Sequence, residues 1–173
     1  RSSRWTDLRV STLKELWRTS KENFDVVLAD VGAFLELDQS LMYETSLPRR
    51  HAASLTALES ADVTVICARA DSVGITRLVR GYLEFHELFA NSEVHVVLWG
   101  LTGNTQSKNV RDAVSRHTGI ESIFEISYDF DANQKALQHN TFVGLQDSKH
   151  AISKEFQELA RVIQQKLELH SKT

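Results

Sequence analysis

The sequence predicts an α/β fold, a doubly wound and mainly parallel sheet covered by helices on both faces. The first observation is a set of four short apolar runs, at residues 24–29, 63–68, 94–99 and 123–126. The second is helical periodicity in the intervals between them, which are long enough to hold crossover helices. Strands that alternate with such helices form βαβ units, and right-handed crossovers place helices on both faces of the sheet.

The first run, FDVVLA at residues 24–29, stops on Asp30 and has Gly32 two positions later. Strands that are buried on both faces of a parallel sheet are unbroken apolar runs, so these residues are predicted to form a strand. A stripe of large apolar residues predicts a helix before it; the stripe comprises Leu8, Leu13, Leu16 and Trp17.

Apolar stripes at one-turn spacing predict four further helices. They comprise Ala52, Leu55 and Leu58; Ile75, Leu78, Val79, Tyr82, Leu83 and Phe85; Val110, Ala113 and Val114; and Ile152, Phe156, Leu159, Ala160, Ile163 and Leu167. Pro48 fits the first turn of the helix that includes residues 51–60. The last helix has mixed charge on its polar face, so it is expected to dock on the sheet rather than on a membrane. Residues 100–107 are predicted to be a loop, and residues 31–47 remain unassigned.

Composition indicates one domain, residues 1–173, of ordinary globular character. Hydrophobic residues make up 42% of the chain and charged residues 25%, and the net charge of -3 creates no field that attracts nucleic acid or anionic lipid. The single cysteine, Cys67, excludes a disulfide framework and a cysteine metal site. The seven histidines have no metal-ligand spacing. No signal peptide and no run of about 18 apolar residues is present, so we expect a cytoplasmic protein.

The loops that follow the four predicted strands are expected to share one edge of the sheet, where open α/β sheets bind their ligands. These loops contain Asp30, Asp71, Thr102, Asn104, Asp129 and Asp131. Carboxylate, hydroxyl and amide groups suit a hydrated magnesium ion that carries a polyphosphate, although cations for the phosphate are scarce. The alternative interpretation is that an aspartate at a strand end caps the next helix.

Four segments, in this order, resemble the C-terminal half of the ParA/MinD-type ATPases, the deviant-Walker branch of P-loop proteins that includes pilus-assembly relatives. Residues 24–32 (FDVVLADVG) are similar to the Walker B strand of the family. Residues 58–66 (LESADVTVI) are similar to the entry to its next strand, and residues 94–100 (VHVVLWG) to the strand that ends in an adenine-reading asparagine. Residues 124–144 (FEISYDFDANQKALQHNTFVG) are similar to the segment that borders the adenine.

The resemblance implies roles for individual residues. Asp30 would be the catalytic Walker B aspartate that holds Mg²⁺ through water, and the backbone N–H of Gly32 would lie near the γ-phosphate. Asp129 would border the adenine, and Asn104 is a further candidate for contact with the nucleotide. Trp99 replaces the adenine-reading asparagine, where it either stacks on the base or fills the core.

The phosphate loop of the family, a glycine-rich turn with two lysines, is missing. The chain contains no Gly-x-x-x-x-Gly-Lys-[Ser/Thr] motif. It also has Asp-Val-Gly in place of the family's Asp-Thr-Pro, and Ser127 in place of a proline. We expect the chain, which starts at Arg1, to be the C-terminal portion of a longer ATPase. The alternative is a degenerate relative that binds protein partners without nucleotide. In either case this chain alone is not expected to hydrolyse ATP.

For the intact protein, the resemblance implies ATP and Mg²⁺ as cofactors and a homodimer that closes around them. This chain alone, without the phosphate loop, is not expected to bind ATP and Mg²⁺. The role implied is chromosome or plasmid partitioning, division-site placement, or pilus or secretion assembly. DNA binding through arginines such as Arg69, Arg77 and Arg80 is weakly supported, since such residues usually form solvated helix faces. A receiver-like domain phosphorylated on Asp30 is also conceivable, but the lysine that it requires after a later strand is absent.

Overall fold

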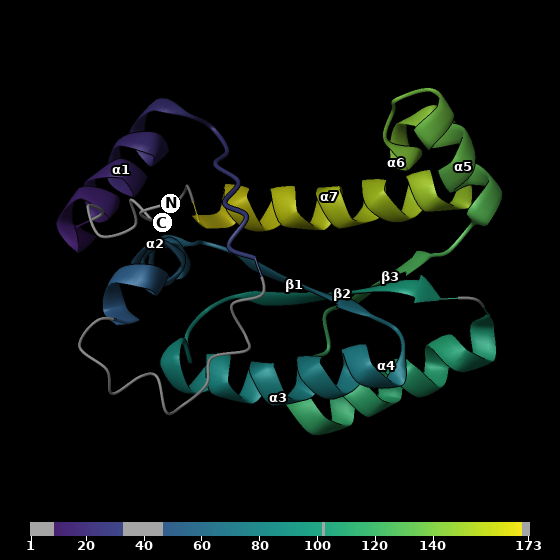
Figure 1. Cartoon of the computed structure of the whole chain (residues 1–173), viewed down its shortest axis with the longest axis horizontal. Helices are drawn as coiled ribbons and strands as arrows, with labels where there is room; N and C mark the ends of the chain where they lie inside the picture. The colour runs from purple at the N-terminus through teal and green to yellow at the C-terminus, as the bar shows by residue number, and fades with distance from the viewer. Residues whose placement is uncertain (1–8, 33–46, 102, 171–173) are drawn as a thin grey trace, which may run out of the picture. The chain divides into compact units, whose positions relative to one another are not determined.

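The structure is a computed structural model that describes residues 9–32, 47–101 and 103–170 (Figure 1). Contacts within the chain group it into two compact units. The first comprises Arg1–Ala61 and Glu84–Asn91, and the second comprises Asp62–Leu83 and Ser92–Thr173. Each unit is described by itself below.

In the first unit, helices α1 (Val10–Asn23) and α2 (Leu47–Ser60) pack against each other. The indole Nε1 of Trp17 on α1 donates a hydrogen bond to the hydroxyl of Thr56 on α2, at 3.1 Å. Thr56 is only 2% exposed, and its hydroxyl in turn donates to the carbonyl oxygen of Ala52, at 2.7 Å. This buried relay fixes the register between the two helices.

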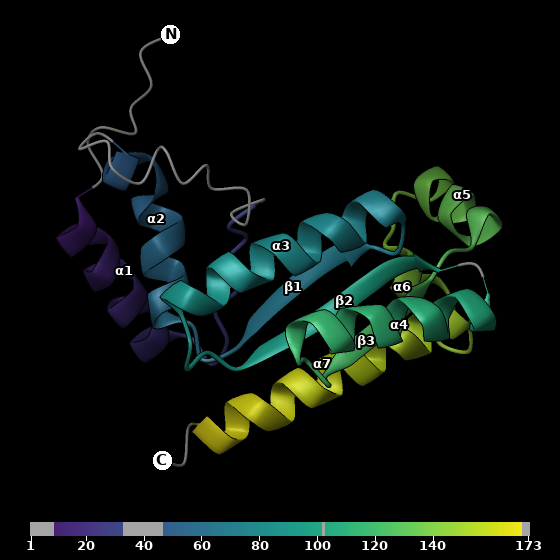
Figure 2. The ribbon, with the colours of Figure 1, turned by 90° about the horizontal axis from the view of Figure 1, so that it is seen from below.

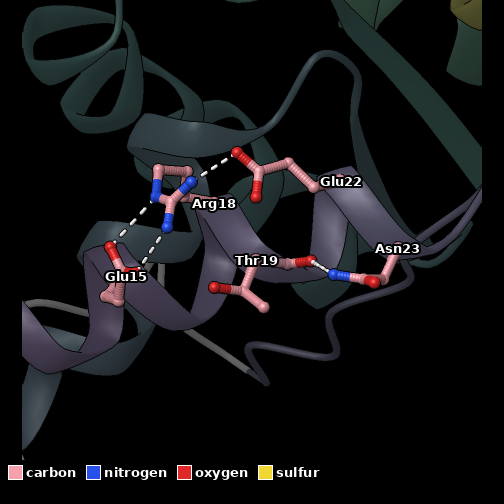
Figure 3. A network of polar contacts seen from close by, with 5 residues as sticks. All are labelled: Glu15, Arg18, Thr19, Glu22 and Asn23. Atoms are coloured by element: carbon pink, nitrogen blue, oxygen red, sulfur yellow. Dashed lines mark hydrogen bonds and ion pairs between the residues drawn. The ribbon is translucent and has the colours of Figure 1, made fainter.

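The exposed face of α1 carries a ladder of ion pairs, which Figure 3 shows. The guanidinium of Arg18 donates to the carboxylates of Glu15 and Glu22, three and four residues away. These bonds lower the pKa of Glu15 and raise that of Arg18. Pairs at this spacing support a helix locally but contribute little when solvent surrounds them, so the network is structural.

The second unit contains a parallel three-stranded sheet in the order β1-β2-β3. The strands are β1 (Thr64–Arg69), β2 (Val94–Leu101) and β3 (Ile123–Ser127). Two helices, α3 (Ser72–Leu88) and α4 (Asn104–Thr118), cover one face, and α7 (Ala151–His170) lies along the other (Figures 1 and 2). The second unit contains α3 only up to Leu83. The predicted α/β class, with a parallel sheet and helices on both faces, is confirmed.

The core of the second unit forms where α7 packs on the sheet. Ile152 of α7 is 1% exposed and contacts Val97 of β2 and Ile126 of β3. Phe124, Phe156 and Leu159 pack around these three. The prediction that the last helix docks on the sheet is therefore confirmed. Burying such side chains contributes roughly 1.5–3 kcal/mol each, which makes α7 an integral layer of this unit.

The prediction of a strand at residues 24–29 is wrong. These residues pair with no strand in the described part of the chain, and Phe24 and Leu28 are 66% and 91% exposed. An unbroken apolar run identifies a segment that is suited to a buried strand, but a strand exists only where a neighbouring strand accepts its hydrogen bonds. The sheet that the described residues form therefore has three strands.

The predicted loop at residues 100–107 is also too long. Strand β2 continues to Leu101 and α4 begins at Asn104, which leaves residues 102 and 103 between them. Two helices that the sequence did not reveal follow β3, namely α5 (Phe130–Gln138) and α6 (Val143–Gln146). The position of Pro48 is confirmed, since α2 begins at Leu47. Across the described ranges, no helix is long and apolar enough to cross a membrane.

Candidate functional site at the carboxyl edge of the sheet

The carboxyl ends of the three strands lie at one edge of the second unit. Directly after β1 ends, the N–H of Ala70 donates a hydrogen bond to the carbonyl oxygen of Trp99 on β2, at 2.9 Å. The N–H of Tyr128 likewise donates to the carbonyl oxygen of Leu101, at 3.0 Å. These bonds tie the three strand ends together and place Asp71, Trp99 and Asp129 on the same edge.

Asp71 caps helix α3. Its Oδ1 accepts a hydrogen bond from the N–H of Gly74 at 2.7 Å, and its Oδ2 pairs with Nε of Arg69 at 2.9 Å. A Cβ atom at Gly74 would overlap the carbonyl oxygen of Arg69 and lie 3.0 Å from its carbonyl carbon. The start of α3 is thus pressed against the end of β1, and only glycine fits there.

Trp99 lies on the solvent-facing side of this edge, and Arg69 lies over its ring. The Trp99 side chain is 43% exposed, and the guanidinium carbon of Arg69 is 5.4 Å from the ring centroid. The two residues are register partners on β1 and β2. The interpretation that Trp99 fills the core is therefore wrong. The pair presents a planar aromatic and cationic surface, which is the kind of surface on which a nucleobase stacks.

Asp129 caps helix α5 and holds His150. Its Oδ1 accepts from the N–H of Ala132 at 2.9 Å, and its Oδ2 lies 3.2 Å from Nε2 of His150. The hydrogen bond from Ala132, followed by the contact with His150, lowers the pKa of Asp129. Nδ1 of His150 accepts from the N–H of Ile152 at 3.3 Å, so its Nε2 carries the proton. Because both imidazole nitrogens are engaged, this pair joins two helix starts rather than serving as a general base.

Glu155 of α7 closes the end of β3. Its carboxylate accepts from the N–H of Ser127 at 2.8 Å and from the Ser127 hydroxyl at 2.5 Å. Sequence reasoning treated Glu155 as part of the solvated face of the last helix and gave His150 no role. Their partners lie 28 and 21 positions away in the chain, so no local pattern could have revealed these contacts.

The other predicted site residues are placed as follows. Asp30 and Gly32 belong to the first unit, where the N–H of Gly32 donates to Oδ1 of Asp30 at 3.0 Å and Gly32 has φ +66°. This is a tight turn of the type that aspartate and glycine favour. Asn104 is the first residue of α4. Thr102 lies outside the described residues.

The described side chains include no group of three or more His, Cys, Asp or Glu residues that could hold a metal ion. A magnesium ion in a nucleotide site does not need such a group, since one or two carboxylates, water and phosphate oxygens complete its shell. Asp30 is exposed, and its Oδ1 accepts one hydrogen bond. The exposed carboxylate and its bond to Gly32 are what an aspartate in a tight turn shows, and the role with Mg²⁺ is implied by the resemblance alone.

Comparison with known proteins finds no matching family model, no similar curated protein and no similar solved structure.

Proposed function

We propose that the carboxyl edge of the sheet binds the base of a nucleotide, and that the chain is part of a ParA/MinD-like ATP-binding ATPase. The observation that supports this most is the exposed Trp99 ring under the guanidinium of Arg69, at the end of the central strand. Ligands of open α/β sheets bind at this edge. Aromatic rings and guanidinium planes stack on bases whatever the base sequence.

Within this proposal each residue has a separate task. Trp99 and Arg69 stack on the base, and Asp129 and Asn104 border it. For Asp30 and Gly32 only the resemblance implies roles, contact with Mg²⁺ through water and with the γ-phosphate, because both residues belong to the first unit. Magnesium, when bound, would supply positive charge to the phosphates. The cations of a phosphate loop are also required for hydrolysis, and this chain lacks that motif, so no turnover is expected. The exposed Trp99 ring beside Arg69 is the reason for proposing that the chain alone still binds the base, contrary to the expectation from the missing loop.

The cellular role that goes with this proposal is positioning or assembly in the cytoplasm. It covers chromosome or plasmid partitioning, division-site placement, and pilus or secretion assembly. Two copies of the intact protein would close around ATP, and hydrolysis would loosen the dimer. This cellular role and the dimer are supported by the resemblance to the ParA/MinD-type ATPases alone.

Tryptophan fluorescence tests the base-binding site directly. The chain has three tryptophans, Trp5, Trp17 and Trp99, and we expect Mg²⁺-ATP to quench the emission of Trp99. Trp99→Leu is expected to remove that quenching and to weaken binding about tenfold, the loss of one base-stacking contact. Trp17→Phe, which alters a tryptophan of the first unit, serves as the matched control and should retain the quenching. Equal binding of inorganic tripolyphosphate and ATP would contradict a base site.

A second candidate function is a protein-interaction module that does not bind nucleotide. The observation that favours it is the engagement of two predicted site carboxylates in structural bonds, Asp71 with Gly74 and Arg69, and Asp129 with Ala132 and His150. Under this alternative, Mg²⁺-ATP would leave the thermal stability unchanged, whereas a bound nucleotide raises it by an amount that grows with the logarithm of its concentration over Kd.

A further inference from the structure

A buried histidine lies at the opposite, amino end of the sheet. His95, the second residue of β2, is 1% exposed and packs edge-on against Phe124 of β3, with ring centroids 5.8 Å apart. Its Nδ1 lies 2.6 Å from the hydroxyl of Ser122. Its Nε2 is buried and has no hydrogen-bond partner among the residues that the structure describes. A buried polar atom in this state is costly and therefore requires an explanation.

The nearest charge to that nitrogen belongs to an ion pair between the sheet and α7. Oε1 of Glu93 lies 3.8 Å from Nε2 of His95 and 2.7 Å from Nζ of Lys166. The carboxylate favours the tautomer in which Nε2 carries the proton and Nδ1 accepts from Ser122. A second proton, added at Nδ1, would require only that the Ser122 hydroxyl rotate to accept it.

The part of α7 that carries Lys166 is less firmly packed than the part near its start. Ile152 and Ser153 in its first turn are 1% and 0% exposed. Between Lys154 and Glu168, in contrast, no described residue of α7 is fully buried, and the best covered are half-buried. A helix with this gradient of burial opens first at its C-terminal end.

We propose that His95 is a proton-controlled latch: when its ring becomes an imidazolium, Glu93 exchanges Lys166 for Nε2 of His95, and the C-terminal turns of α7 loosen from the sheet. In the exchange Nε2–H donates to Glu93, Nδ1–H donates to Ser122, and Lys166 releases Glu93. One proton is taken up from solvent and no covalent bond changes.

The charges around His95 set the direction of the effect. Burial lowers its pKa, Glu93 raises it and Lys166 lowers it further. Ser122 and Phe124, which also contact the His95 ring, are uncharged. The latch is therefore closed at neutral pH and opens as the pH falls below the ordinary histidine value of 6.5. This inference concerns the edge opposite to the proposed base site and does not depend on nucleotide binding.

Hydrogen–deuterium exchange of the full chain tests the latch, with rates corrected for the intrinsic effect of pH. Between about pH 7.5 and about pH 5, we expect the protection of residues 160–168 to fall about tenfold, which corresponds to about 1.4 kcal/mol in the opening equilibrium. Protection of β2 should stay unchanged. His95→Gln should abolish the pH effect, whereas His117→Gln, at an exposed position on α4, should retain it.

Lys166→Met provides a second test that does not require any change inside the core. Without the competing ammonium, Glu93 favours the imidazolium more strongly, so the midpoint of the exchange transition should move to higher pH. An equal loss of protection in the wild type and in His95→Gln would overturn the proposal. So would a Lys166→Met midpoint that is unchanged or moves to lower pH.

Discussion

The two aspartates at the carboxyl edge of the sheet act mainly as hydrogen-bond acceptors for backbone N–H groups. Asp71 and Asp129 each accept a backbone N–H at the start of the helix that follows their strand, from Gly74 and from Ala132. The sequence identified both aspartates correctly as strand-end residues. It could not separate a ligand-binding aspartate from a helix cap, because the two occupy the same position between strand and helix.

Gly74 is predicted to be intolerant of any side chain. Gly74→Ala should destabilise the protein by about 1–3 kcal/mol, because the added methyl group overlaps backbone atoms of Arg69 that cannot move aside. Urea unfolding measures the loss. Gly103→Ala is the matched control, since no atom lies within 4 Å of its Cβ position and its backbone is extended. Equal stability of the two variants would show that α3 does not press on β1.

Asp129 is predicted to make stability depend on pH in the acid range. Its pKa in the folded chain lies below the ordinary value of 3.8, so its contribution is present above that value and is lost as the pH falls through the folded pKa. Asp129→Ala should lower Tm at pH 7, and the difference from the wild type should shrink below about pH 3. Asp129→Asn retains an acceptor for the Ala132 N–H, so its Tm should fall less than that of Asp129→Ala. A difference that is the same at both pH values would contradict this role.

At the scale of elements, the sequence was informative wherever periodicity alone decides the structure. The stripes that predicted α1, α2, α3, α4 and α7 were correct, and so were the runs that predicted β1, β2 and β3. Residues 24–29 failed because strand formation depends on a partner rather than on apolar content. Helices α5 and α6 were missed because the acidic, aromatic segment that precedes them resembles a loop.

The packing of α1 on α2 depends on the buried Thr56 hydroxyl. Thr56→Val keeps the shape but leaves the Trp17 indole N–H without its acceptor, so we expect a loss of about 1–2 kcal/mol. Thr76→Val is the control: the Thr76 hydroxyl also donates to a carbonyl of its own helix, that of Ser72, but it is exposed. Chemical denaturation should show little change for this control. Equal losses would mean that the bond to Trp17 contributes nothing.

For the molecule as a whole, the sequence predicted the α/β class and the parallel sheet with helices on both faces. It could not predict that Trp99 would be exposed beneath Arg69, because a tryptophan that ends an apolar strand fits a core equally well. It also gave no indication of the contacts that Glu155 makes with Ser127 and His150 makes with Asp129, because these residues are distant in sequence and meet only in the folded chain.

The whole chain is predicted to lack ATPase activity by itself. Phosphate release from Mg²⁺-ATP should be no faster than in the Asp30→Ala variant, because no phosphate loop supplies the cations that stabilise the transferring group. A colorimetric phosphate assay provides the measurement. Turnover that exceeds the background and is lost in Asp30→Ala would show that the chain completes a catalytic site on its own.

The parallel register of β1 and β2 places a cysteine close to Trp99, which allows a fluorescence energy-transfer measurement. Cys67, the only cysteine of the chain, is exposed and is the register partner of Val97, two residues before Trp99. Two residues along a strand span about 7 Å. An acceptor dye attached to the Cys67 thiol would therefore lie within energy-transfer range of the Trp99 indole. The chain thus contains its own donor and attachment point, and a ligand that displaces the dye from Trp99 would change the transfer efficiency.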